Sequence, residues 1–166
     1  MNVIYSFSLL HGFKTDTFDI LGLAQIENEL PTSLTCGTYT MTYPPWSNYN
    51  INGKPYWWYT KRGIIPSRVP TKEIVVSYMQ EISCVTITGE NLLKFISFKI
   101  QKIKKGDFRQ TEIITMWKSL IDVEKEYTII NYVIQISSGG FVRYFGNLMK
   151  GTCLNINRLS YLIDKQ

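Results

Sequence analysis

An alternating apolar segment that runs into a Ser-Ser-Gly-Gly turn is the strongest constraint on how this chain can fold. Its apolar side chains fall on every second position, at Ile130, Tyr132, Ile134 and Ile136. This spacing is typical of a strand with one face in a core. The two glycines of the turn permit torsions and close approaches that a Cβ would forbid. The pattern predicts a strand, a tight turn and then a helix whose start carries Arg143. A functional site can form at such a junction.

Length and composition favour a single globular domain over residues 1–166. The chain has 166 residues, of which 45% are hydrophobic and 19% charged. These proportions are those of an ordinary folded domain rather than a disordered one. No apolar run reaches the roughly 18 residues that a membrane span needs, and the first residues lack the charged start of a signal peptide. We therefore expect a cytoplasmic protein with no membrane partner.

The cysteines argue against a disulfide framework and against zinc. There are three of them, an odd number, and they are far apart, at Cys36, Cys84 and Cys153. A zinc site usually needs close pairs of ligands. We expect buried or idle thiols, no metal and no cofactor.

The charge and the aromatic content suit RNA. The net charge is +5, and aromatic residues make up 14% of the chain, including 11 Tyr and 4 Trp. Cations can meet phosphates while rings stack on splayed bases. A modest positive charge also occurs in proteins that never bind nucleic acid, so composition alone leaves both readings open.

The remaining pattern alternates between strands and helices. We expect strands at residues 3–10, 23–26, 39–43, 73–84 and 125–138. Helices are expected at residues 56–63, 92–103, 113–121, 141–150 and 155–163, the last two separated by Gly151. Residues 11–22 and 46–54 are expected to be loops, and Asp107 is expected to cap a helix.

Three groups of polar or aromatic residues have competing interpretations. In the 11–22 loop, Asp16 and Asp19 are expected to accept backbone hydrogen bonds, because no second titrating group is spaced nearby. The aromatic run Tyr56–Tyr59 could be a stacking platform, but core packing is the preferred interpretation. The lysines at positions 94, 99, 102, 104 and 105 fit either a solvated face or a phosphate-facing edge.

Four ordered pieces resemble the TruB family of tRNA pseudouridine synthases. Tyr5 through Gly12 and then Thr15-Asp16-Thr17-Phe18-Asp19-Ile20-Leu21-Gly22 are similar to the family's tyrosine strand and Thr-Asp-Thr-x-Asp-x-x-Gly loop. The other pieces are Pro44-Pro45-Trp46-Ser47, then Gly53-Lys54-Pro55-Tyr56 with Lys61-Arg62-Gly63, and Ile136-Ser137-Ser138-Gly139-Gly140-Phe141-Val142-Arg143. Together they span most of the chain.

The resemblance implies a role for several residues. Tyr5 would stack on the flipped target uracil. Arg143 would pair with the catalytic aspartate and help to keep it ionised. Phe141, where the family usually has tyrosine, and Leu159 would also contact the base. Basic side chains that would bind the RNA are Lys14, Lys54, Lys61 and Arg62. Without the ordered pieces, Tyr5 and Phe141 would be read as core residues and Arg143 as an ordinary helix cation.

The chain departs from the family at the nucleophile. The family carries its aspartate on a Gly-x-Leu-Asp-Pro-x-Ala-x-Gly loop upstream of the tyrosine strand, and this sequence has no such loop. No aspartate in the chain has that setting, as its five are Asp16, Asp19, Asp107, Asp122 and Asp164. None is assigned as nucleophile.

The resemblance therefore predicts the C-terminal part of a pseudouridine synthase that isomerises a uridine of the tRNA TΨC loop. The fold would be α+β, a mainly antiparallel mixed sheet with packed helices, forming a partial catalytic domain with a two-helix insertion at residues 89–122. Its partners would be the TΨC stem-loop and a separately encoded N-terminal half. This chain alone would be inactive. The alternatives are a catalytically inactive RNA-binding or RNA-folding protein and an unrelated α+β interaction domain.

Overall fold

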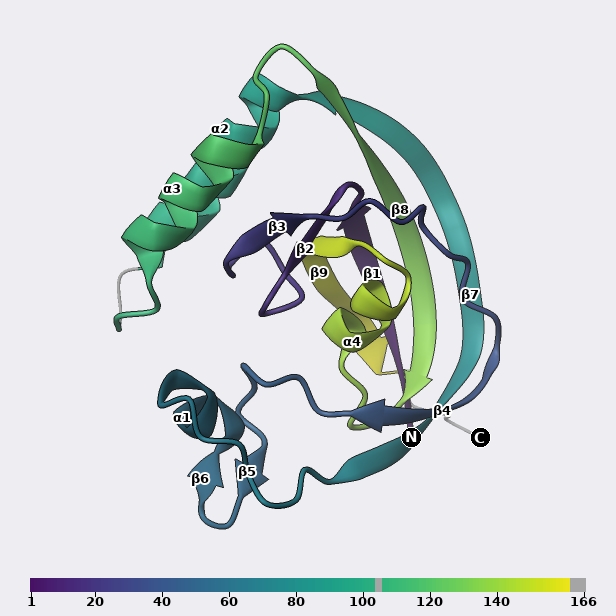
Figure 1. The fold of residues 1–166 in the computed structure, drawn as a ribbon. Coiled ribbons are helices and arrows are strands. Elements are labelled where there is room, and N and C mark those ends of the chain that lie inside the picture. Colours follow the sequence, from purple (N-terminus) through teal and green to yellow (C-terminus); the bar gives the residue numbers. More distant parts are fainter. Residues whose placement is uncertain (104–105, 162–166) are drawn as a thin grey trace.

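The expected α+β architecture is confirmed in a computed structural model, which describes residues 1–103 and 106–161. Five strands form one antiparallel sheet in the order β4-β7-β8-β1-β9. Their bounds are β1 Asn2–Leu10, β4 Gly37–Thr42, β7 Thr71–Thr88, β8 Glu126–Ser137 and β9 Thr152–Tyr161. The sheet curls strongly, and the helices lie on its concave side (Figure 1). Lys104 and Lys105, which were predicted to extend a basic helix face, lie outside the described residues.

The strand predicted from alternation forms the middle of this sheet. β8 pairs with β1 on one side and with β7 on the other, and Tyr5 lies opposite Ile134. The turn that follows closes with a hydrogen bond from the Gly140 amide to the Ser137 carbonyl, at 3.4 Å. Gly139 has a φ of 86°, in the region that favours glycine. α4, Val142–Leu148, begins directly after the turn and carries Arg143, as predicted.

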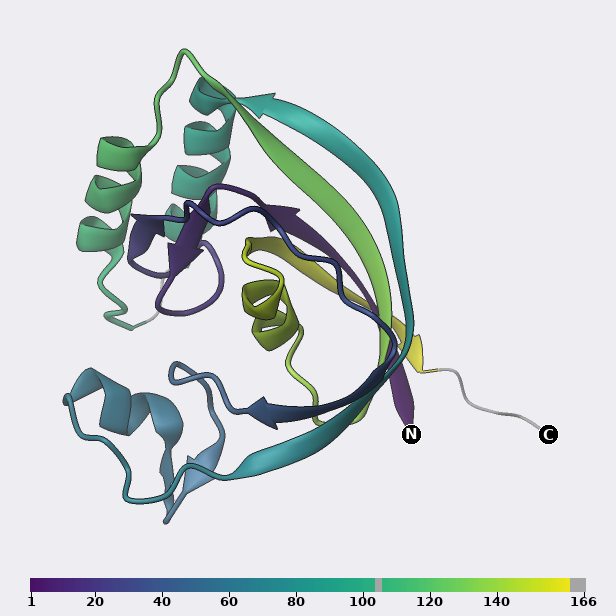
Figure 2. The same ribbon diagram turned by 45° about the vertical axis from the view of Figure 1, so that its right-hand side comes forward.

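Two hydrophobic clusters divide the core. The first lies between the sheet and α4, where Phe145 and Ile134 are fully buried. The second lies under a helical hairpin, where Trp117 and Ile113 are fully buried. Figure 2 shows α4 against the sheet and the helical hairpin apart from it, toward one end of the long strands.

The hairpin consists of α2, Gly89–Gln101, and α3, Gln110–Leu120. It occupies the span in which two inserted helices were expected. The Thr88 hydroxyl caps α2 by accepting a hydrogen bond from the Asn91 amide. The predicted cap at Asp107 is wrong: its carboxylate accepts from the Arg109 amide, and Arg109 itself, at a φ of 68°, precedes α3.

Short elements build the rest of the molecule. β2, Phe13–Thr15, pairs with β3, Ala24–Ile26, so part of the predicted 11–22 loop is a strand. β5, Asn50–Ile51, pairs with β6, Lys54–Pro55, within the predicted 46–54 loop. They lead into α1, Tyr56–Lys61, near the predicted position. No helix among the described residues is long and apolar enough to cross a membrane.

The predicted closing helix at residues 155–163 is wrong. The described part of this segment belongs to β9, which pairs antiparallel with β1. Asn155 and Asn157 are poor helix formers, and Leu154 and Ile156, which alternate with them, also fit a period of two. The side of β1 that faces away from β8 offers backbone hydrogen-bond partners to this segment, and pairing with β1 favours the strand over the helix.

Candidate functional site

A tightly bonded loop at residues 16–22 forms the base of the candidate site. The Thr17 hydroxyl and the Leu21 amide both donate to Asp19 Oδ1, at 2.6 and 3.0 Å. Asp16 Oδ1 accepts from the Leu23 amide at 2.9 Å. A Cβ at Gly22 would overlap Thr17, so the loop needs glycine there. The expectation that both aspartates are local acceptors is confirmed.

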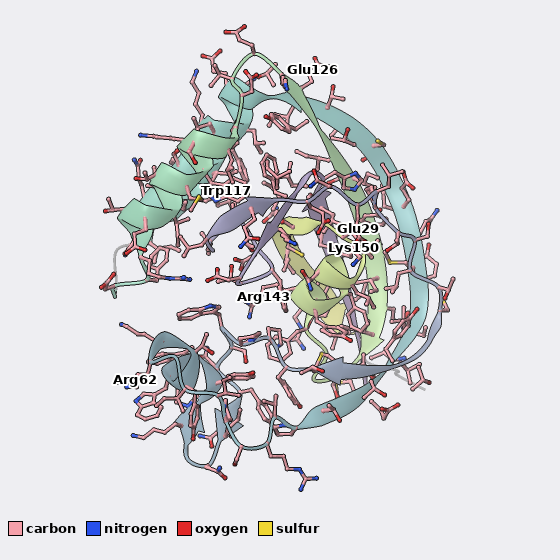
Figure 3. The ribbon with its side chains drawn as sticks, viewed as in Figure 1. Glu29, Arg62, Trp117, Glu126, Arg143 and Lys150 are labelled. Atoms are coloured by element: carbon pink, nitrogen blue, oxygen red, sulfur yellow. The ribbon has the colours of Figure 1, made fainter. Side chains whose placement is uncertain are left out.

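Arg143 reaches this loop from the first turn of α4. Its Nη1 donates to the Thr17 carbonyl at 2.9 Å, and both terminal nitrogens lie 3.5 Å from the Trp46 carbonyl. Nη1 also lies 3.9 Å from Asp19 Oδ2, with only 19% and 21% of the two side chains exposed. In Figure 3 the Arg143 side chain points away from the sheet toward the opening between the hairpin and α1. Arg143 therefore joins three pieces of sequence that were recognised separately.

A second arginine arrives from the helical hairpin. Arg109 Nη1 lies 2.7 Å from Asp16 Oδ2, and its guanidinium stacks 4.3 Å from the Trp46 ring centroid. The absence of a titrating group spaced nearby in the sequence therefore did not reveal that each loop aspartate has an arginine beside it in the fold. The partners are distant in sequence, so spacing along the chain gave no sign of them.

Burial and hydrogen bonding act against each other at Asp19. Loss of solvent raises the pKa of the Asp19 carboxyl, while the Thr17 hydroxyl, the Arg143 charge and the Leu21 amide each lower it. Burial prevails, and the pKa is raised from its ordinary value. Burial also raises the pKa of the neighbouring Cys153 thiol, which makes it a poor nucleophile.

The residues expected to contact a base lie around the first hydrophobic cluster. Tyr5 and Phe141 are half-buried and pack against it. The Phe141 ring also meets the Tyr43 ring edge-on at 5.8 Å and lies 6.0 Å from the Arg143 guanidinium. The structure thus brings Phe141 next to Arg143 and places Tyr5 on the same cluster.

Leu159 has a different setting. It lies on β9 with 52% of its surface exposed and belongs to neither core cluster. Because Ile4 pairs with Ser160 and Tyr5 with Arg158, Leu159 is the extra residue of a β-bulge beside Tyr5. It follows Arg158, the cross-strand partner of Tyr5, and lies on a strand and not on the predicted helix.

The basic residues expected to bind RNA fall into two places. Lys54 and Arg62 approach the Trp58 ring at 5.6 and 4.1 Å, and Lys61 is exposed on the same helix. Lys14 lies on β2, away from α1 (Figure 1). The preferred core packing of the aromatic run holds only in part. Tyr56 packs against the first hydrophobic cluster, but α1 has no fully buried residue and Trp57 is 37% exposed.

A cavity of about 330 Å³ adjoins the site and was missed by sequence reasoning. It lies between the loop, the end of α2 and β9, and its walls are mainly aliphatic. Its polar lining comes from Asp19, Asn155, Lys99 and Lys102. The two lysines also fold over phenylalanine rings one turn earlier, Phe95 and Phe98. The cavity forms where the 16–22 loop, the end of α2 and β9 come together in the fold.

The described residues hold no cluster of three or more His, Cys, Asp or Glu side chains that could bind a metal ion. In comparisons with known proteins, no model of a protein family matches the chain and no curated protein matches it significantly.

Proposed function

We propose that this chain is an RNA-binding piece of a TruB-like pseudouridine synthase acting on the uridine of the tRNA TΨC loop. In that reaction the bond between uracil N1 and the sugar breaks, the base rotates, and C5 bonds to the same sugar carbon, while C5 loses its proton and N1 gains one. The isomerisation needs no redox partner and no cofactor. It does need an aspartate nucleophile, which we propose is supplied in the cytoplasm by a polypeptide segment outside this sequence.

The observation that carries the proposal is the convergence on Arg143. Three of the four resembling pieces meet at its guanidinium: its own helix start, the Thr17 carbonyl and the Trp46 carbonyl. Unrelated segments would have no reason to meet around one cation. Arginine has five N–H donors, and the Arg143 Nε–H has no acceptor among the described residues. This spare donor can serve an added carboxylate.

The residues would divide the work as follows. Arg143, held in place by the loop, would keep the incoming aspartate ionised. Tyr5 and Phe141 would offer faces to the flipped uracil, with Leu159 beside Tyr5. Lys54, Lys61 and Arg62 would contact phosphates around the exposed rings of α1.

Direct binding tests the RNA part of the proposal. We expect the purified chain to bind a TΨC stem-loop more tightly than a hairpin of equal length with a scrambled loop. A well-folded sample that binds neither RNA at low salt would contradict the proposal and favour an unrelated interaction domain.

Product analysis tests the missing nucleophile. We expect no pseudouridine from this chain alone, measured by pseudouridine-specific chemical labelling of the bound RNA. Addition of a polypeptide carrying a Leu-Asp-Pro loop of the family should produce it. Pseudouridine formed without that addition would show that this chain itself contains the nucleophile.

A catalytically inactive RNA-binding or RNA-folding protein is the second candidate. The feature that favours it is the carboxylate already beside Arg143, since Asp19 can neutralise the arginine without a second polypeptide. Stem-loop binding with no product in the reconstituted mixture would favour this candidate.

A further inference from the structure

β7 leaves a long edge without a partner. One side of β7 pairs with β8 from Val76 to Thr88, but the other side pairs with β4 only from Thr71 to Val76. Among the described residues, no strand pairs with the outer side of Ser77–Thr88. This segment is about 40 Å long at the usual rise of about 3.3 Å per residue. Figures 1 and 2 show it at the outer margin of the curled sheet.

The edge lacks most of the features that normally prevent strand association. Proteins protect free edges with lysines, prolines, bulges or short strands. Ser77–Thr88 contains no lysine and no proline, and its single charge is Glu81. It has bulges near Val76 and near Ile82, but its last six residues pair with β8 without interruption. Ile82 is 56% exposed and Val85 is 45% exposed.

We propose that Ser77–Thr88 binds the same segment of a second copy, as antiparallel strands across a two-fold axis. An extended strand can bond to such a row of backbone N–H and C=O groups along its whole length and replace the water that otherwise solvates them. An antiparallel pair of identical edges is isologous, so it closes after two copies and leaves neither edge open. Pairing of the whole segment with its copy places the two-fold axis between Ile82 and Ser83, which sets each Glu81 opposite Cys84 and not opposite the other Glu81.

The opposite edge of the sheet, β9, is the less suitable partner, and residues 18–20 already bond to it at Cys153. A contact between β7 of one copy and β9 of another would be heterologous. The resulting assembly would still have an unpaired β7 edge at one end and an unpaired β9 edge at the other, so further copies could add to form a polymer. The β7 pair instead joins two five-stranded sheets into one continuous sheet. This inference does not depend on the proposed RNA function, because it uses only the edge of the sheet opposite β9.

A matched pair of valines provides the test. Val75 and Val85 lie on the same strand and are each 45% exposed, but Val75 is in the part already paired with β4. We expect the wild-type chain and V75K to be dimers by light scattering during size-exclusion chromatography. V85K should be a monomer, and I82K should weaken the dimer as an independent variant. Circular dichroism checks that each variant folds.

Hydrogen exchange locates the contact. The amides on the outer side of Ser77–Thr88 should exchange more slowly at high protein concentration than at low concentration, and V85K should lose this difference. A wild-type monomer over the whole concentration range would overturn the proposal, as would equal dimerisation of V75K and V85K. Open-ended polymers in place of a dimer would overturn the isologous arrangement.

Discussion

The guanidinium of Arg143 lies 3.9 Å from the carboxylate of Asp19. The two residues are far apart in the sequence, because Arg143 follows β8 and Asp19 follows β2. The pair is mostly shielded from solvent, and Asp19 is held from its other side by the Thr17 hydroxyl and the Leu21 amide. This contact ties α4 to the loop that resembles the Thr-Asp-Thr-x-Asp motif, and it sets the direction in which Arg143 can offer its remaining donor.

Replacement of Arg143 should destabilise the protein. In Arg143→Met the Thr17 carbonyl loses its 2.9 Å donor and Asp19 loses its nearest cation. We expect a loss of about 1–3 kcal/mol in the free energy of unfolding, measured by urea denaturation. Arg62→Met is the control, because Arg62 is exposed and contacts only Trp58. Equal stability of Arg143→Met and wild type would show that the contact contributes nothing.

Asp19 should make stability depend on pH. Its folded-state pKa is raised from 3.8, so above that value the unfolded chain binds fewer protons than the folded one. The contribution of Asp19 is therefore fully present below the ordinary value and is lost as the pH rises through the raised value. The difference in unfolding free energy, wild type minus Asp19→Asn, should fall over this window. A difference that increases with pH would mean that hydrogen bonding and Arg143 outweigh burial.

Trp117 should be the most sensitive residue of the helical hairpin. It is fully buried, and its indole N–H donates to the Ile20 carbonyl at 2.9 Å. Trp117→Phe removes this donor and some volume, and we expect a loss of about 2–4 kcal/mol in urea denaturation. Trp57→Phe is the matched control, since Trp57 is partly exposed and should change stability by about 0.5 kcal/mol or less. Similar losses in both variants would contradict this account of the hairpin contact.

The basic residues around Trp58 should determine how RNA binding responds to salt. Each phosphate contact removed reduces the slope of log affinity against log salt by about 1. We expect this reduction in Lys54→Ala and in Arg62→Ala, measured by fluorescence anisotropy with the TΨC stem-loop. Lys94→Ala is the control, because Lys94 lies on α2 and already pairs with Glu90. An equal change in the control would show that only net charge matters.

Patterns that depend on neighbours in sequence predicted much of the fold. Alternation identified β1 and β8, and helical spacing identified α2 and α3. The Ser-Ser-Gly-Gly turn and the helix start at Arg143 follow from glycine torsions, which are local. The segment at residues 155–163 was predicted wrongly because its local preference is weak and pairing with β1 decided it.

The candidate site was only partly predictable for the same reason. The loop aspartates were correctly assigned as backbone acceptors, since their bonds are local. Their arginine partners, the exposure of Trp57 on α1 and the cavity beside Asp19 all depend on how distant segments pack.

The sequence by itself determined where strands, helices and tight turns can form, because backbone torsions and side-chain periodicity act over a few residues. It also determined that Arg143 follows directly after the glycine turn. Only the tertiary structure decided that Arg143 meets Asp19 and Trp46 and that Arg109 meets Asp16. It also decided that, among the described residues, no strand pairs with the outer side of Ser77–Thr88 in β7. These features depend on strand order and helix packing, which arise from contacts between segments far apart in the chain.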